Sequence, residues 1–152
     1  VDLSDLRNHK NLQELNLSEC ELFHSTKQLA FTTGFSGIRK LTLADCNGRI
    51  NFLDFNFAKL ECLSLIEVSK ELRFEIEDKD QSEAIQDKSK CFSLDTLRYC
   101  PKLTSIKVSG SSQLNIQFSR GTFALFPFVE TATFARCDFS FVGQLDASAP
   151  TI

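Results

Sequence analysis

The segment Leu12-Gln13-Glu14-Leu15-Asn16-Leu17-Ser18-Glu19-Cys20-Glu21-Leu22 has the pattern L-x-x-L-x-L-x-x-C-x-L. Leu15 and Leu17 alternate with polar neighbours, so we expect a short strand with one buried face and one face in water. Cys20 follows where the strand must turn, and a small thiol can pack under such a bend as an apolar group. A unit of this kind cannot bury its apolar face alone, so it must stack on copies of itself.

Further copies of this pattern follow along the chain. Their anchors are Ile38, Leu41, Leu43 and Cys46; Leu60, Leu63, Leu65 and Val68; Leu103, Ile106, Val108 and Ser111; and Val129, Ala132, Phe134 and Cys137. The first anchors of successive copies are separated by about 26, 22, 43 and 26 residues. The cysteine recurs at one offset in Cys20, Cys46 and Cys137. Unrelated amphipathic strands in an α+β domain would leave that common offset unexplained.

The pattern and its period resemble leucine-rich repeats. The resemblance implies an α/β leucine-rich repeat solenoid of about five repeats, with a curved parallel sheet and short helices or irregular turns on its convex side. The phrase Cys100-Pro101-x-Leu103-x-x-Ile106-x-Val108 is similar to the cysteine-containing repeats of F-box-type substrate adaptors. The strand ends Leu17-Ser18-Glu19-Cys20 and Leu43-Ala44-Asp45-Cys46 resemble those of NOD-like immune receptors.

The organisation along the chain follows from the repeats. We expect residues 1–152 to form a single repeat segment of a longer chain, because neither end carries the polar cap of a complete solenoid. The long third spacing indicates either a repeat with an insertion or two repeats of which one is unreadable, and we favour a charged insertion at residues 75–90 because that segment shows no strand alternation. Leu72 to Ile76 alternates and predicts an extra strand, whereas Phe92 to Cys100 predicts a short inward-packed helix that ends at Pro101.

Composition excludes several function classes. The 152 residues are 42% hydrophobic and 24% charged, as in an ordinary soluble globular protein. The net charge of -3 offers no general basic field for nucleic acid or anionic membrane. No apolar run approaches the roughly 18–20 residues that span a bilayer. We therefore expect neither a nucleic-acid nor a membrane partner.

The six cysteines bear on the compartment. Cys20, Cys46 and Cys137 occupy equivalent repeat positions, which favours a column of reduced, structural thiols and a cytoplasmic or nuclear protein. An extracellular location is the alternative if the cysteines are oxidised. A bridge between Cys91 and Cys100, which lie near the insertion, is the exception that the spacing leaves open.

No motif for catalysis is present. The sequence lacks glycine-rich phosphate loops, a G-x-S-x-G nucleophile elbow and H-E-x-x-H. The acidic cluster Glu75-Glu77-Asp78-Asp80 lacks the spacing and central glycine of a calcium loop, so it predicts a solvated segment. We therefore expect no catalytic residue, cofactor, metal or small-molecule substrate.

The remaining candidate site is the exposed strand face, predicted as the concave face of the sheet. Its predicted partner-binding residues are Glu14, Asn16, Glu19, Lys40, Thr42, Asp45, Ser64, Glu67, Lys107 and Arg136. Glu19, Asp45 and Glu67 would form an acidic stripe beside a basic end at Lys107 and Arg136. Such a stripe can steer a basic protein partner and fix its orientation.

Two classes of function fit these predictions. The first is a non-catalytic protein-binding module, either a substrate-recognition adaptor or an immune-receptor sensor. The second is a structural or autoinhibitory segment of a larger signalling protein. A fragment of an extracellular receptor ectodomain is a further alternative, which depends on the oxidation state of the cysteines.

Overall fold

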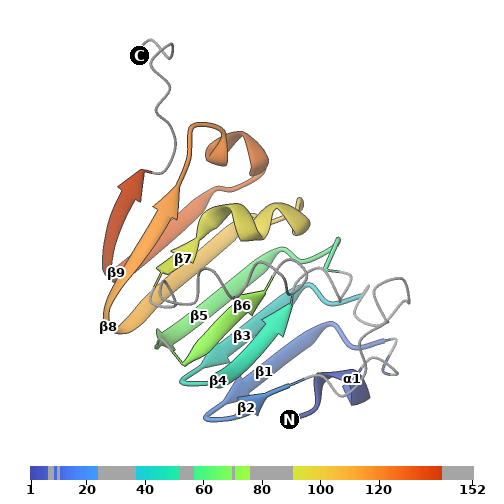
Figure 1. Ribbon diagram of the computed structural model, residues 1–152. Coiled ribbons are helices and arrows are strands. Elements are labelled where there is room, and N and C mark those ends of the chain that lie inside the picture. Colours follow the sequence, from blue (N-terminus) through green and yellow to red (C-terminus); the bar gives the residue numbers. More distant parts are fainter. Residues whose placement is uncertain are drawn as a thin grey trace.

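The computed structural model describes residues 1–6, 9, 11–23, 37–51, 57–69, 71–75 and 91–141 (Figure 1). The strands are β1 (Glu14–Ser18), β2 (Glu21–Leu22), β3 (Lys40–Ala44), β4 (Asn47–Asn51), β5 (Cys62–Val68), β6 (Leu72–Glu75), β7 (Cys91–Ser93), β8 (Ser105–Phe118) and β9 (Thr131–Phe141). One short α-helix, α1 (Leu3–Leu6), and two 3-10 helices, η2 (Leu94–Tyr99) and η3 (Thr122–Leu125), complete the elements named below.

The sheet that we call the first sheet has six parallel strands, of which five stack in the order β1, β3, β5, β8 and β9 and the sixth, β7, pairs with β8. The register places equivalent leucine-pattern positions side by side: Leu15, Leu41, Leu63, Ile106 and Ala132. The predicted parallel stacking of the repeat strands is therefore confirmed.

A second parallel layer is a three-stranded sheet of β2, β4 and β6. β1 to β6 thus make about three turns of a solenoid-like arrangement, with one strand of each turn in each layer. β8 and β9 continue it as long bent strands that reach both layers, and β7 pairs with the far half of β8. In Figure 1 the bends between the layers follow one edge of the molecule.

The start of each first-sheet strand repeats one hydrogen-bond arrangement. The carbonyl of Gln13 accepts from the amides of both Arg39 and Lys40, at 2.8 and 3.1 Å. The carbonyls of Arg39, Glu61 and Thr104 each accept in the same way from two consecutive amides of the following turn. Successive turns therefore have equivalent backbone geometry although their spacing along the chain varies.

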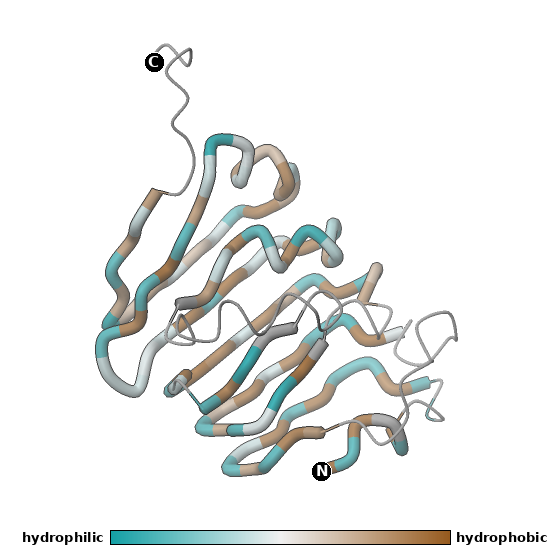
Figure 2. The backbone as a smooth tube through the Cα atoms, in the orientation of Figure 1, coloured by the Kyte–Doolittle hydropathy of each residue, from teal (hydrophilic) through white to brown (hydrophobic). Residues whose placement is uncertain are grey.

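The core fills the space between the two layers. In the inner turns the anchors are almost fully buried, with Leu41 at 1% and Leu65 at 0% exposure. At the two ends of the stack the equivalent Leu15 and Phe134 are only half-buried, because each is covered on one side alone. Figure 2 shows the alternation of apolar and polar residues along the strands that produces this division.

Several finer predictions are corrected or extended. Ser111 does not take the cysteine position of its copy, because a register shift between Ser109 and Leu114 places Leu114 beside Cys137. The extra strand predicted from Leu72 is confirmed as β6, and the short inward helix before Pro101 is the 3-10 helix η2. Within the described ranges, helix is confined to α1, η2 and η3, so little of the α component expected of an α/β fold is present. The predicted insertion lies outside the described residues from position 76 onward.

Four of the five bends, those of β1, β3, β5 and β9, contain a residue in the left-handed region, whereas the bend of β8 contains none. Glu19, Asp45, Glu67 and Arg136 have φ of 55°, 54°, 58° and 59°. Side chains other than glycine rarely adopt this conformation, which costs roughly 1–2 kcal/mol per residue. The same dihedral at the same repeat position shows that the bend is a fixed part of the repeat.

We predict that Glu67→Gly raises the free energy of unfolding by up to about 1 kcal/mol, because glycine adopts a positive φ without steric cost. Glu67→Gln keeps the strained backbone and removes only the charge, so it should give a smaller gain. The matched control is Glu14→Gly in β1, which should lower stability because that position is an extended strand. Urea unfolding measures all three variants, and a loss for Glu67→Gly equal to that of the control would contradict the account.

Candidate functional site

The outer face of the first sheet carries the predicted site. Every predicted residue there is exposed or half-buried. The register places Glu14 beside Lys40, and it aligns Asn16, Thr42, Ser64 and Lys107 in one row across four strands. The face is therefore one continuous polar surface, in which the opposite charges of Glu14 and Lys40 are neighbours.

Glu19, Asp45 and Glu67 lie along the edge formed by the bends: Glu19 and Asp45 directly follow β1 and β3, and Glu67 is the second-last residue of β5. We call these three residues the acidic column. The Glu19 amide donates to the Ala44 carbonyl and the Asp45 amide to the Ile66 carbonyl, each at 2.9 Å, so adjacent members are one strand spacing apart. That spacing is about 4.8 Å. All three side chains are exposed, and among the described residues none of their carboxylates forms an ion pair.

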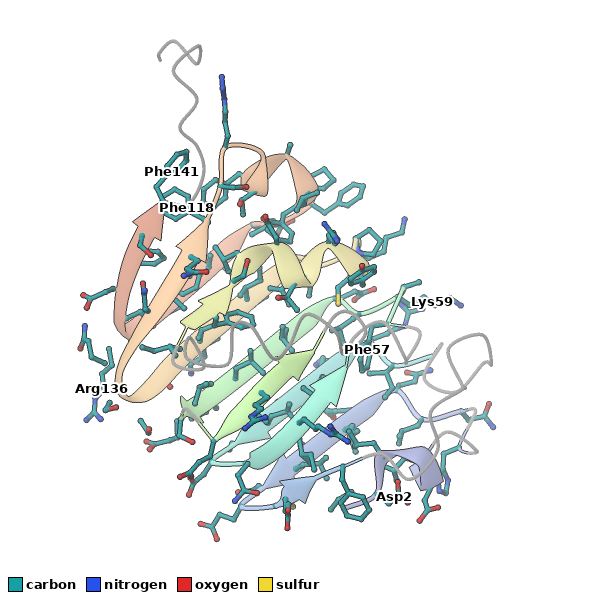
Figure 3. All side chains as sticks on the ribbon, viewed as in Figure 1. Asp2, Phe57, Lys59, Phe118, Arg136 and Phe141 are labelled. Carbon is teal, nitrogen blue, oxygen red and sulfur yellow. The ribbon has the colours of Figure 1, made fainter. Side chains whose placement is uncertain are left out.

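Arg136 occupies the equivalent bend position in β9 but is separated from the acidic column by the bend of β8. There the Glu67 amide donates to Ser109 Oγ at 3.3 Å instead of to a backbone carbonyl. Arg136 Nη1 donates to the Ser111 carbonyl at 3.0 Å, and Figure 3 shows Arg136 at the edge formed by the bends. Gly110 permits this bend, since a Cβ there would lie 2.3 Å from the Ser112 carbonyl oxygen.

Thiols lie directly beneath the bends of β1, β3 and β9. Cys46 Sγ lies 3.5 Å from the Leu17 carbonyl of the preceding turn, and Cys137 Sγ lies 4.0 Å from that of Val108. Both distances are within reach of a weak S–H donor. Burial raises the pKa of both thiols above its ordinary value of 9.0, so they remain protonated and can donate at neutral pH. The predicted role of these cysteines under the turn agrees with this geometry.

Cys100 is a free thiol in the structure, so it forms no bridge with Cys91. It is fully buried at the end of η2, with 0% exposure. Burial raises its pKa from 9.0 to about 12. A thiol of this kind is a packing group and is inert as a nucleophile near neutral pH.

A shallow hollow lies at the other end of the strands, and no pattern in the sequence predicts it. It is lined by Glu61, Lys102, Thr104, Phe128 and Glu130. Lys102 Nζ lies 5.5 Å from the centre of the Phe128 ring, while Glu61 is bonded at 2.6 Å to Arg39. These residues come from the turns between repeats, where no strand alternation marks them in the sequence.

Within the described ranges, no group of three or more His, Cys, Asp or Glu side chains could hold a metal ion. Nor does that part of the chain contain a helix long and apolar enough to cross a membrane. In comparisons with known proteins, no family model, no curated protein and no solved structure matches the chain.

The raised pKa of Cys100 predicts a specific dependence of stability on pH. The folded thiol keeps its proton up to about pH 12, whereas the unfolded thiol loses it near 9.0. Below pH 9.0 the Cys100 thiol is protonated in both states, and its contribution to the free energy of unfolding is fully present. As the pH rises from 9.0 toward 12, the free energy of unfolding falls by up to about 1.4 kcal/mol per pH unit.

Denaturant titration between pH 8 and 10.5 under reducing conditions measures this slope in the wild type and in Cys100→Ala. The variant should be less stable throughout, yet its stability should decline less steeply with pH. Parallel curves for the two proteins would contradict the assignment.

Proposed function

We propose that this chain is a non-catalytic protein-binding module of the leucine-rich repeat type. Its outer first-sheet face and acidic column would dock a partner that carries basic side chains. The observation that carries the proposal is the acidic column itself. Three carboxylates stand at one repeating position, exposed and without an ion-pair partner among the described residues.

The acidic column lowers the stability of the folded protein, and this supports a role in binding. Each member has a positive φ, and like charges at about 4.8 Å repel one another. Asn or Gly at these positions would relieve the strain, and a neutral residue would relieve the repulsion. Side chains that lower the stability of the folded protein at a repeated surface position are typical of functional sites.

The spacing of the column favours a helical partner. Side chains three or four residues apart on an α-helix are separated by about 4.5–6 Å along its axis. An extended peptide separates side chains on one face by about 6.8 Å. A helix with Lys or Arg at positions i, i+3 and i+7 therefore matches a column spaced at about 4.8 Å better than a strand does.

The proposal includes the cellular compartment in which the protein works. The thiols of Cys46 and Cys137 are placed to donate hydrogen bonds beneath the bends, a role that requires the reduced form. This supports the cytoplasm or nucleus. The repeating strand-start hydrogen bonds support five leucine-rich repeats in the described chain.

The proposal predicts that the 152-residue chain binds a helical peptide with Arg at i, i+3 and i+7. Fluorescence anisotropy at low salt measures this binding. The triple variant Glu19→Lys, Asp45→Lys, Glu67→Lys should weaken it by roughly tenfold or more, because three exposed ion pairs become repulsive.

Two controls separate position from net charge. The variant Asp5→Lys, Glu130→Lys, Asp138→Lys changes the net charge equally at exposed sites outside the bends of β1, β3 and β5, and it should keep most of the affinity. A peptide of the same composition with its arginines scrambled should bind more weakly than the ordered peptide. Equal losses in both triple variants would refute docking at the acidic column.

A further inference from the structure

The last strand, β9, presents a long open edge. Within the described residues β9 pairs only with β8, so the backbone amides and carbonyls on its other side have no strand partner. Long exposed edge strands with apolar side chains are prone to pair with another chain. We call the unpaired side of Thr131–Phe141 the β9 edge.

Apolar side chains beside the β9 edge are strongly exposed. Phe139 and Phe141 are 51% and 55% exposed, although they lie on the side of β9 that faces the core. They belong to an aromatic cluster in which Phe118 and Phe141 are 5.4 Å apart between ring centres, and Phe134 and Phe139 are 5.1 Å apart. Figure 3 shows Phe118 and Phe141 together at the end of the molecule away from α1. One flank of this cluster is thus uncovered.

Residues at equal distances on either side of the centre of β9 are suited to pair with one another in an antiparallel arrangement. The bend divides it into two arms, one in each layer, on either side of Arg136 and Cys137. Reading outward from that pair, Ala135 corresponds to Asp138, Phe134 to Phe139, Thr133 to Ser140 and Ala132 to Phe141. In this correspondence each core-facing residue is paired with a core-facing residue, and each residue on the outer side is paired with another on the outer side.

We propose that the β9 edge is the interface of a twofold-symmetric homodimer. The β9 strands of two copies would pair antiparallel, with each first-layer arm beside the second-layer arm of the other copy. The two-fold axis would pass between Arg136 and Cys137. Such an isologous contact uses one surface twice and closes on itself without forming a filament.

Three features of the pairing fit a second copy of the chain. Phe134 would meet the second copy's Phe139, which joins the two aromatic clusters, and the small Ala132 would receive the large Phe141. Thr133 and Ser140 would place hydroxyl groups opposite each other on the outer side. Arg136 would lie diagonally across from the second copy's Asp138, so two opposite-charge contacts flank the axis.

The first experiment tests charge complementarity by sedimentation equilibrium of the 152-residue chain. The wild type should form dimers. Arg136→Asp and Asp138→Arg should each raise the dissociation constant about fivefold or more, because each places like charges across the axis twice. The double variant Arg136→Asp, Asp138→Arg should recover most of the affinity. Lys107→Asp, on the outer sheet face, is the control and should leave the dimer unchanged.

The second experiment tests the antiparallel register by oxidative cross-linking. Thr133→Cys and Ser140→Cys, each alone, should give no cross-link through the new thiol, since neither residue faces its own copy. A mixture of the two variants should give a covalent dimer linked through positions 133 and 140, identified by peptide mapping.

A chain that remains monomeric up to about 1 mM overturns the proposal, since weaker pairing is not a specific interface. Equal cross-linking of either variant alone would also refute the register, as would failure of the double charge variant to recover. These outcomes are independent of peptide binding at the acidic column, because the two experiments report on different surfaces.

Discussion

The whole arrangement depends on parallel backbone pairing between successive turns at a fixed register. The carbonyls of Gln13, Arg39, Glu61 and Thr104 each receive two amides from the next turn, and this sets where every strand begins. Because side chains alternate along a strand, a slip by one residue would turn the leucines outward and the polar row inward. The register therefore determines both the buried core and the composition of the outer face.

The bend at the end of each first-sheet strand is the second constraint. At the bends of β1, β3 and β5 the chain turns into the other layer through one residue with a positive φ, and Glu19, Asp45 and Glu67 supply it without glycine. The thiols beneath the bends donate hydrogen bonds to nearby backbone carbonyls. In the copies without a cysteine, Val68 and Leu114 occupy the cysteine position and contribute apolar packing alone. The bend is thus supported from inside, while the side chains of Glu19, Asp45 and Glu67 are exposed.

Much of the fold could be predicted from the sequence because its cause is local. The L-x-x-L-x-L spacing that begins at Leu12 and Ile38 predicts which strand residues are buried and which are exposed. Its recurrence along the chain predicts that the strands stack. The turn at the cysteine position could be predicted, but its positive φ could not, because Glu, Asp and Arg rarely adopt that conformation. The long β8 was missed because Gly110, Ser111 and Ser112 predict a turn, whereas in the structure they belong to a bend within a continuous strand. The hollow around Phe128 joins turns that are distant in sequence, so no local pattern indicates it.

The central claim is tested most directly by nuclear Overhauser effects across the middle of the first sheet. The account predicts contacts between amide and Hα protons that link Leu41 with Leu63 and Leu63 with Ile106, at the register observed here. Parallel strands bring those protons together and keep Hα protons of neighbouring strands apart. Strong Hα–Hα contacts between these residues, which mark antiparallel pairing, or a register displaced by one residue, would contradict the account.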